Sequence, residues 1–275
     1  MRATPEKATR ETLAALRGAI ARLGAGVVPD AGRKVAGTFS LGAAAPDEIL
    51  GGGLPRAALH EVFSAGSADA PAAAGFGLAL ALRAAGDRPI VWIRQEFVDI
   101  ETGGLYAPGL VAFGLDPDRL ILVSAPDPQA ALRAAGEAAR CPALGAVLIE
   151  LFGAPKILDL TASRRLSLAA AASGLALFAI RVAGEPTPSA AMTRWRVTGA
   201  ASAALAANAP GHPTFAATLL RHRAGPAGRT WFLEWNRDRH VFVERASLSG
   251  AVAAVPVGRP AAPAEFRRTD FRRTG

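Results

Sequence analysis

The sequence predicts an α/β fold with a mostly parallel sheet, and three observations carry this prediction. Short apolar runs typical of buried strands alternate along the chain with helical patterns. A strand-like run at Leu59–Phe63 and a helix-like run at Gly75–Leu82 enclose a loop in the position of a phosphate-binding loop. After about Met192 the rhythm changes to strands separated by turns, which predicts an antiparallel meander that extends the sheet.

The composition fits one domain with extensions. The 275 residues are 51% hydrophobic, enough for a sizeable core, and 29 Gly with 20 Pro supply many turns. A single cysteine, Cys141, excludes an intrachain disulfide framework and favours a reducing compartment. The polar start shows no signal peptide, and the apolar run at 168–180 is shorter than the roughly 18 residues of a membrane span. We therefore expect a cytoplasmic protein.

The net charge of +8 is concentrated at the two ends of the chain. Residues 1–35 carry +4, residues 36–255 carry +1 and residues 256–275 carry +3. The nearly neutral body lacks the basic stripe of a duplex-binding domain. The ends therefore either contact an acidic partner or DNA weakly, or they reflect a general preference for arginine, because only three of the 31 basic residues are lysines.

The elements divide the chain into three predicted parts: an N-terminal helix (1–30), a core (31–245) and a flexible basic tail (246–275). In the first part, Thr4 and Pro5 can start a helix whose apolar stripe is Leu13, Leu16, Ile20 and Leu23. The core has predicted strands at 88–93, 119–123, 144–151 and 175–182, predicted helices at 127–140 and 158–173, and meander strands at 194–197, 218–223, 231–235 and 240–244.

The loop after the first core strand lacks the groups that hold a phosphate. A working loop ends in Gly-Lys-Ser/Thr, so that the lysine neutralises phosphate and the hydroxyl binds magnesium. Here Ala70 stands at the lysine position, Pro71 stands at the hydroxyl position, and Asp69 adds a negative charge toward the phosphates. We expect a degenerate nucleotide site at Ser64, Gly66, Ser67, Asp69, Ala70 and Pro71, with no cofactor and no metal.

Beyond this loop, the chain from Ile49 to Val197 resembles the core of the RecA-like recombinases. The resemblance rests on collinear segments: Gly-Gly-Leu-Pro-Arg at 52–56, Glu-Val-Phe at 61–63, Tyr-Ala-Pro-Gly-Leu at 106–110, Phe-Gly-Leu-Asp-Pro-Asp-Arg-Leu at 113–120 and Ser-Ala-Pro-Asp-Pro-Gln-Ala-Ala-Leu at 124–132. It implies an ancestral ATPase with a P-loop core.

Three further positions matter in this resemblance. Glu96 matches the family's water-orienting glutamate, Glu150 matches the acid that holds magnesium, and Ala179 replaces the phosphate-sensing glutamine at the end of a strand. Without the lysine and hydroxyl, two carboxylates would repel a triphosphate. We interpret Glu96 and Glu150 as solvated carboxylates at strand ends, with residual catalysis as the alternative. The short segments 152–156 and 183–189, in place of the family's DNA-facing loops, argue against strand exchange.

Shorter motifs make the chain similar to the ImuA family over roughly residues 36–245. These motifs are Ala-Ser-Arg-Arg-Leu at 162–166, Thr-Arg-Trp at 193–195 and Phe-Leu-Glu-Trp at 232–235. The family, also described as SulA-like or RecA-like, belongs to bacterial damage-inducible (SOS) mutagenesis operons. The resemblance implies a non-catalytic assembly factor for translesion synthesis. Its implied partners are ImuB, an inactive Y-family polymerase relative, and through it an error-prone C-family polymerase and the sliding clamp, together with the RecA recombinase.

Two segments are candidate partner-binding surfaces. The first is the apolar stripe of the N-terminal helix, which suits either another chain or the chain's own core. The second is the tail, where Phe-Arg-Arg-Thr occurs twice at a five-residue interval and supplies Phe266, Arg267, Arg268, Phe271, Arg272 and Arg273. The tail is either a linear motif whose phenylalanines anchor on a partner or a solubilising end. A RecA-like ATPase and a DNA-binding repair protein remain the alternative functions.

Overall fold

The computed structural model describes residues 11–19, 37–203, 205, 207, 209 and 211–245. Nine strands of this part form one sheet, in the order β11-β10-β9-β8-β3-β7-β6-β4-β5. The strands are β3 (Ala58–Ser64), β4 (Ile90–Gln95), β5 (Leu120–Ala125), β6 (Ala146–Phe152), β7 (Ala176–Val182), β8 (Thr193–Gly199), β9 (Thr214–His222), β10 (Thr230–Asn236) and β11 (Val241–Arg245). A separate pair, β1 (Thr38–Phe39) and β2 (Leu54–Pro55), lies beside them.

The predicted fold is confirmed. Strands β3 to β8 pair in parallel, and β8 to β11 then pair in antiparallel as the predicted meander. Their central members are buried on both faces, which explains why these strands are continuous apolar runs. The meander strands alternate buried and half-exposed residues, because the described helices cover only one of their faces.

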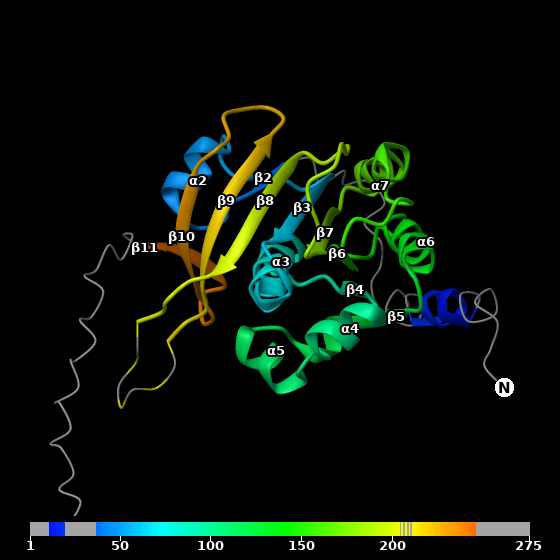
Figure 1. Ribbon diagram of the computed structural model, residues 1–275, viewed down its shortest axis with the longest axis horizontal. Helices are drawn as coiled ribbons and strands as arrows, with labels where there is room; N and C mark the ends of the chain where they lie inside the picture. The colour runs from blue at the N-terminus through cyan, green and yellow to red at the C-terminus, as the bar shows by residue number, and fades with distance from the viewer. Residues whose placement is uncertain are drawn as a thin grey trace, which may run out of the picture.

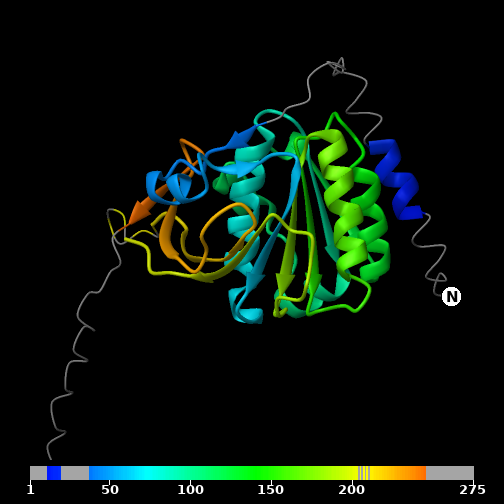
Figure 2. The same ribbon diagram turned by 90° about the horizontal axis from the view of Figure 1, so that it is seen from above.

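Helices cover both faces of the parallel part (Figures 1 and 2). On one face, α3 (Ala70–Ala85) packs on β7 and β6, and on the other face α6 (Pro128–Ala138) and α7 (Leu160–Ser173) pack on β6 and β3. Each face encloses its own apolar core. The remaining helical elements are α2 (Ala44–Ile49), η1 (Ser67–Asp69), α4 (Glu96–Thr102), α5 (Ala107–Phe113) and η2 (Pro117–Arg119).

Side-chain caps set the starts of α6 and α7. Asp127 accepts a hydrogen bond from the Ala130 amide at 2.7 Å, and Asp159 accepts one from the Ala162 amide at the same distance. Each carboxylate satisfies an N–H that lacks a helical partner at a helix N-terminus. The predicted helices therefore begin within a residue or two of their expected positions.

Two glycines allow close approaches that position α3 and the first core strand. A Cβ on Gly77 would lie 2.9 Å from Ile180 Cδ1, so the glycine lets α3 pack directly on β7. Gly53 has φ +126, and a Cβ there would lie 2.1 Å from the Phe39 carbonyl oxygen. The Gly-Gly-Leu turn is thus required where β2 passes beside β1.

Aromatic side chains join the meander to α3. The ring of Phe76 lies 5.6 Å from Trp195 and 5.2 Å from Phe242, centroid to centroid. Trp195 in turn lies 6.0 Å from Trp231, and both indoles are buried. Offset and edge contacts of this kind add to the burial of large apolar surfaces. These tryptophans therefore pack the core rather than stack bases.

The described part of the N-terminal helix packs on the chain's own core, which is one of the two alternatives that the sequence left open. In the helix formed by residues 11–19, Leu16 is 2% exposed among the side chains under α6 and α7, and Leu13 packs against the same core. Arg17 adds an exposed ion pair with Glu137 at 3.1 Å. The two other stripe residues, Ile20 and Leu23, lie outside the described residues, as does the predicted tail.

Two helices, α4 and α5, were not predicted. Their segment joins β4 to β5, and Gly103 and Gly104 separate two helices of 7 residues each, which are too short to show a helical period. Glu96, expected at a strand end, is instead the first residue of α4. The position of this segment matters because it forms one wall of the cavity described below.

We predict that Leu16→Ala lowers the free energy of unfolding by about 2–3 kcal/mol, because it removes a buried side chain and leaves a cavity. Urea unfolding measures the change. Ala15→Ser, at an exposed position of the same helix, is the control and should shift stability by no more than about 0.5 kcal/mol. Unchanged stability of Leu16→Ala would show that the stripe is not held by the core of its own chain.

Candidate functional site

Three positions of the loop between β3 and α3 have no amide free for a phosphate. The Asp69 amide donates to the Gly66 carbonyl at 3.2 Å, the Ala70 amide donates to the Ser67 carbonyl, and Pro71 has no N–H. The Ser64 hydroxyl accepts a hydrogen bond from the Ala183 amide at 2.9 Å. A phosphate-binding loop works by presenting successive free amides to the anion. Three consecutive positions here present none.

Asp69 does not face the expected phosphate position, which corrects the sequence interpretation. Its Oδ1 accepts a hydrogen bond from the Gly199 amide at 3.2 Å, so the carboxylate lies toward the end of β8. The side chain therefore joins the start of α3 to the point where the meander begins. This hydrogen bond links the start of α3 to the end of β8.

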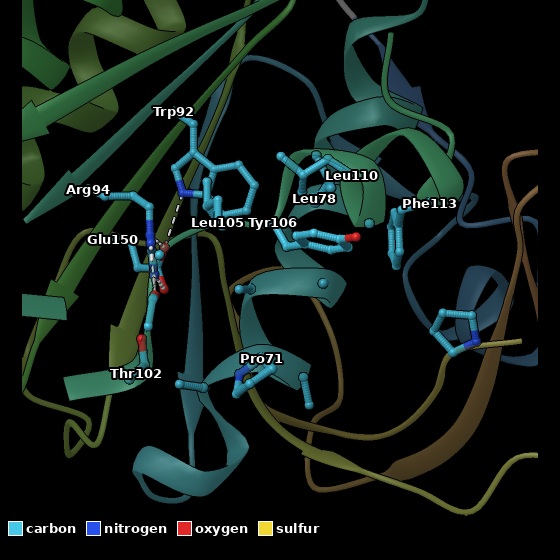
Figure 3. A pocket seen from close by; sticks show the side chains of 18 of the residues that line it. Pro71, Leu78, Trp92, Arg94, Thr102, Leu105, Tyr106, Leu110, Phe113 and Glu150 are labelled. Atoms are coloured by element: carbon cyan, nitrogen blue, oxygen red, sulfur yellow. Dashed lines mark hydrogen bonds and ion pairs between the residues drawn. The ribbon is translucent and has the colours of Figure 1, made fainter. Parts of the chain in front are cut away.

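Glu150 is not a solvated carboxylate; the structure places it in a buried ion pair. Its exposed fraction is 0%, and its Oε2 lies 2.6 Å from Arg94 Nε and 3.2 Å from Trp92 Nε1 (Figure 3). Arg94 also donates to Asp99 and to the Gly103 carbonyl. Burial raises the pKa of the Glu150 carboxyl, and the Arg94 guanidinium opposes that rise.

Arg94 therefore supplies the positive charge beside Glu150 that a magnesium ion would supply beside such a carboxylate. A guanidinium is always charged and donates hydrogen bonds in a fixed plane, so it neutralises Glu150 and orders the segment after α4. This arrangement depends on three elements, because Trp92 and Arg94 come from β4, Glu150 from β6 and Asp99 from α4.

The other two predicted site residues lie apart from this pair. Glu96 is exposed at the start of α4 and accepts a 3.4 Å hydrogen bond from Ser124 of β5, so of the two carboxylates it alone is solvated. Ala179 lies in the middle of β7 and is buried in the core under α6 and α7. The strand continues for three residues beyond it, so Ala179 is not the strand-end position of a phosphate sensor.

A second buried cluster, on the opposite face of the sheet, was not predicted. Glu61 of β3 is 1% exposed, and its Oε2 lies 2.9 Å from Arg194 Nε and 2.7 Å from the Ser189 hydroxyl. Arg181 lies 3.8 Å from the other carboxylate oxygen. A signal was visible in the sequence, since charged residues interrupt the otherwise apolar strands β3 and β7.

This cluster holds the two short segments that replace longer loops in the recombinases. Arg181 donates to the Gly153 carbonyl at 2.9 Å, in the turn after β6. Arg194 donates to the Thr187 carbonyl at 2.6 Å, in the turn after β7. The turn after β6 and the turn after β7 are therefore each joined to the buried Glu61 carboxylate through an arginine.

A cavity of about 480 Å³ opens beside the Arg94–Glu150 pair. The start of α3, the segment from Thr102 to Phe113, and the first residues of β9 form its walls (Figure 3). Apart from the ion pair, the lining is predominantly apolar, and its large side chains are Leu78, Leu105, Tyr106, Leu110, Phe113 and Phe215. Such walls suit an apolar group better than a triphosphate.

Comparisons with known proteins identify relatives of the chain. The chain is 33% identical over 205 residues to Protein ImuA of Caulobacter vibrioides, from strain NA1000 / CB15N and equally from strain ATCC 19089 / CIP 103742 / CB 15. The match covers 69% of this chain and 80% of the relative. The chain belongs to the ImuA family. No model of a protein family matches it.

A solved structure shows the same fold as this ImuA-family chain. The crystal structure of the RadB recombinase superimposes with a TM-score of 0.51 at 16% identity, covering 76% of this chain and 100% of RadB. At that identity the likeness concerns the fold alone. The RecA-like fold expected from the collinear segments is thereby confirmed.

The described residues contain neither a candidate membrane-spanning helix nor a candidate metal site. None of the helices among them is both long and apolar enough to cross a membrane. Within the same residues, no group of three or more His, Cys, Asp or Glu side chains is arranged to hold a metal ion.

The buried pair leads to a prediction about stability. Arg94→Met should lower the free energy of unfolding by about 3–5 kcal/mol, because it leaves Glu150 buried without a cation, and the double variant Arg94→Met/Glu150→Leu should lose less than the sum of the two single variants. Arg140→Met, which removes an exposed pair with Glu137, is the control and should change stability by no more than about 1 kcal/mol.

The deficit of Arg94→Met should also depend on pH. Without the guanidinium, the pKa of Glu150 rises further above the unfolded value, so the folded chain holds a proton that the unfolded chain releases. Stability is then retained below the unfolded carboxyl pKa and lost as pH rises. Urea unfolding at pH 5 and pH 8 should show the larger deficit at pH 8, and an equal deficit at both would contradict a buried Glu150 carboxylate.

Proposed function

We propose that this ImuA-family chain is a non-catalytic accessory protein of DNA damage-inducible, error-prone translesion synthesis in the bacterial cytoplasm. The observation that carries the proposal is the state of the loop before α3. The Asp69 and Ala70 amides are already bonded, the lysine and hydroxyl positions are Ala70 and Pro71, and Arg94 pairs with the carboxylate Glu150. Phosphoryl transfer requires cations positioned on the phosphates, and neither Ala70 nor Pro71 supplies the charge or the hydroxyl that such a loop contributes.

The partner that we propose is an ImuB-like inactive Y-family polymerase relative. Through it the chain would join an error-prone C-family polymerase and the sliding clamp, and the RecA recombinase is a further proposed partner. The described half of the N-terminal stripe packs on its own core. The tail, with Phe266, Phe271 and their arginines, therefore remains as the proposed partner-binding segment.

The second candidate function, a RecA-like ATPase, is favoured by the strand–loop–helix frame at β3 and α3. Nucleotide binding separates it from the accessory role. We predict that calorimetric titration of the full chain with MgATP shows no saturable heat at millimolar concentrations, while an active recombinase in the same buffer does. Saturable heat of MgATP binding that is lost in Pro71→Glu, at an exposed position in the first turn of α3, would support the ATPase function instead.

We further predict that Phe266→Ala/Phe271→Ala weakens pull-down of the ImuB-like partner at least about tenfold, because buried aromatic anchors carry much of the binding energy of such interfaces. The damage-induced mutation frequency should fall with it. Thr269→Ala/Thr274→Ala is the matched control in the same tail and should leave both measurements unchanged. If the phenylalanine variant retains wild-type partner pull-down and wild-type damage-induced mutation frequency, the tail is only a solubilising end.

A further inference from the structure

The cavity beside Arg94 and Glu150 is shaped for an apolar ligand group. Its volume of about 480 Å³ falls within the range of roughly 300–1,000 Å³ that is typical of small-molecule sites. Figure 3 shows Tyr106 and Phe113 with Leu78 and Leu110 on one side, facing the polar pair across the space. Tyr106 is 72% exposed, so an aromatic ring stands at the mouth of the cavity.

The polar groups of the cavity have no free charge to offer. Arg94 bonds to Glu150, Asp99 and the Gly103 carbonyl, and the Trp92 indole N–H donates to the same Glu150. An anionic ligand would have to displace these contacts and would meet a carboxylate behind them. A neutral aromatic or aliphatic group fits the cavity without disturbing the pair.

One exposed carboxylate lies next to the cavity. Glu101 is exposed, directly precedes the lining residue Thr102, and forms no ion pair with another described residue. A ligand that places an apolar group in the cavity would therefore gain from cationic groups beside it.

The chain itself contains a segment of this chemistry. Residues 265–275 carry two phenylalanines, Phe266 and Phe271, each followed directly by two arginines. The segment can reach the cavity, because Phe242 of β11 packs 6.2 Å from Phe215, and the Phe215 ring lines the cavity. More than 20 residues separate Phe242 from Phe266, and an extended chain spans about 3.3 Å per residue.

We propose that the cavity is a peptide-binding site that takes a phenylalanine of the tail of the same chain, with an adjacent arginine on Glu101. The phenylalanine ring lies between Tyr106, Phe113 and Phe215, and the arginine pairs with the Glu101 carboxylate. The inference concerns the isolated chain and does not depend on the proposed polymerase partner.

A photo-crosslinking experiment on the full chain tests this docking. The photoreactive residue p-benzoylphenylalanine replaces Phe266 in one preparation and Phe271 in another, each illuminated without any partner protein. We expect peptide mass spectrometry to find cross-links to the segments 102–113 or 213–215. A mixture of isotopically heavy and light chains separates cross-links within a chain from those between chains, and we expect light–light and heavy–heavy products only.

Variants of the cavity sharpen the test. A Cβ at Gly75 would lie 3.5 Å from the Phe215 ring and 3.6 Å from the Phe113 ring, so Gly75→Leu fills the space between them without an initial clash. It should reduce the cross-link yield at least about fivefold. Gly136→Leu, on α6 where a Cβ meets nothing within 4 Å, is the matched control and should leave the yield unchanged. Circular dichroism checks that both variants fold.

Glu101→Arg provides a second variant at an exposed position, where the fold is not at risk. This substitution reverses the charge of the carboxylate next to the cavity, so it should also lower the cross-link yield. Raised salt should lower the cross-link yield as well. The proposal is overturned if no cross-link reaches the cavity, if cross-links join different chains, or if neither Gly75→Leu nor Glu101→Arg changes the yield.

Discussion

A carboxylate buried within a sheet must be paired with a cation, and this protein contains one such carboxylate on each face of its parallel strands. Glu150 is paired with Arg94 beneath α4, and Glu61 is paired with Arg194 and Arg181 near the turns after β6 and β7. Removing either set of arginines would leave an uncompensated buried charge. The segments around the sheet's carboxyl ends are arranged around these two pairs.

The first pair lies beside a loop in which the Asp69 and Ala70 amides are already bonded and Pro71 has no N–H. The arginine supplies the charge that a metal would otherwise supply, and it also bonds to Asp99 and Gly103. Those bonds fix the segment after β4 in place, and this segment then forms a wall of the cavity. The site thus combines a neutralised ion pair with an apolar space.

On the other face of the sheet, the arginines paired with Glu61 also fix neighbouring segments in place. Arg181 and Arg194 hold the turns after β6 and β7 through the carbonyls of Gly153 and Thr187. A segment whose carbonyls are bonded to buried arginines has little freedom to reorganise on DNA. The two turns are therefore fixed by the core of the sheet.

Much of the fold was open to prediction from the sequence, because it follows from local patterns. Apolar runs of strand length alternate with helical patterns, Asp127 and Asp159 can cap helices without help from distant residues, and collinear segments suggested the RecA-like order of strands. The absent lysine and hydroxyl of the loop were also visible, since they are a matter of residue identity at fixed spacing.

The tertiary structure alone decided the partners of the charged residues. Arg94 and Glu150 are 56 positions apart, and Glu61 and Arg194 are 133 apart, so no local spacing could predict that they meet. Ala179 was assigned to a strand end through the family resemblance, although the strand predicted at 175–182 already extended beyond it, and β7 does continue to Val182. Whether Leu16 faces its own core or another chain depends equally on contacts across the sheet. An amphipathic stripe shows only that a face is apolar, and what covers it depends on the packing of the whole chain.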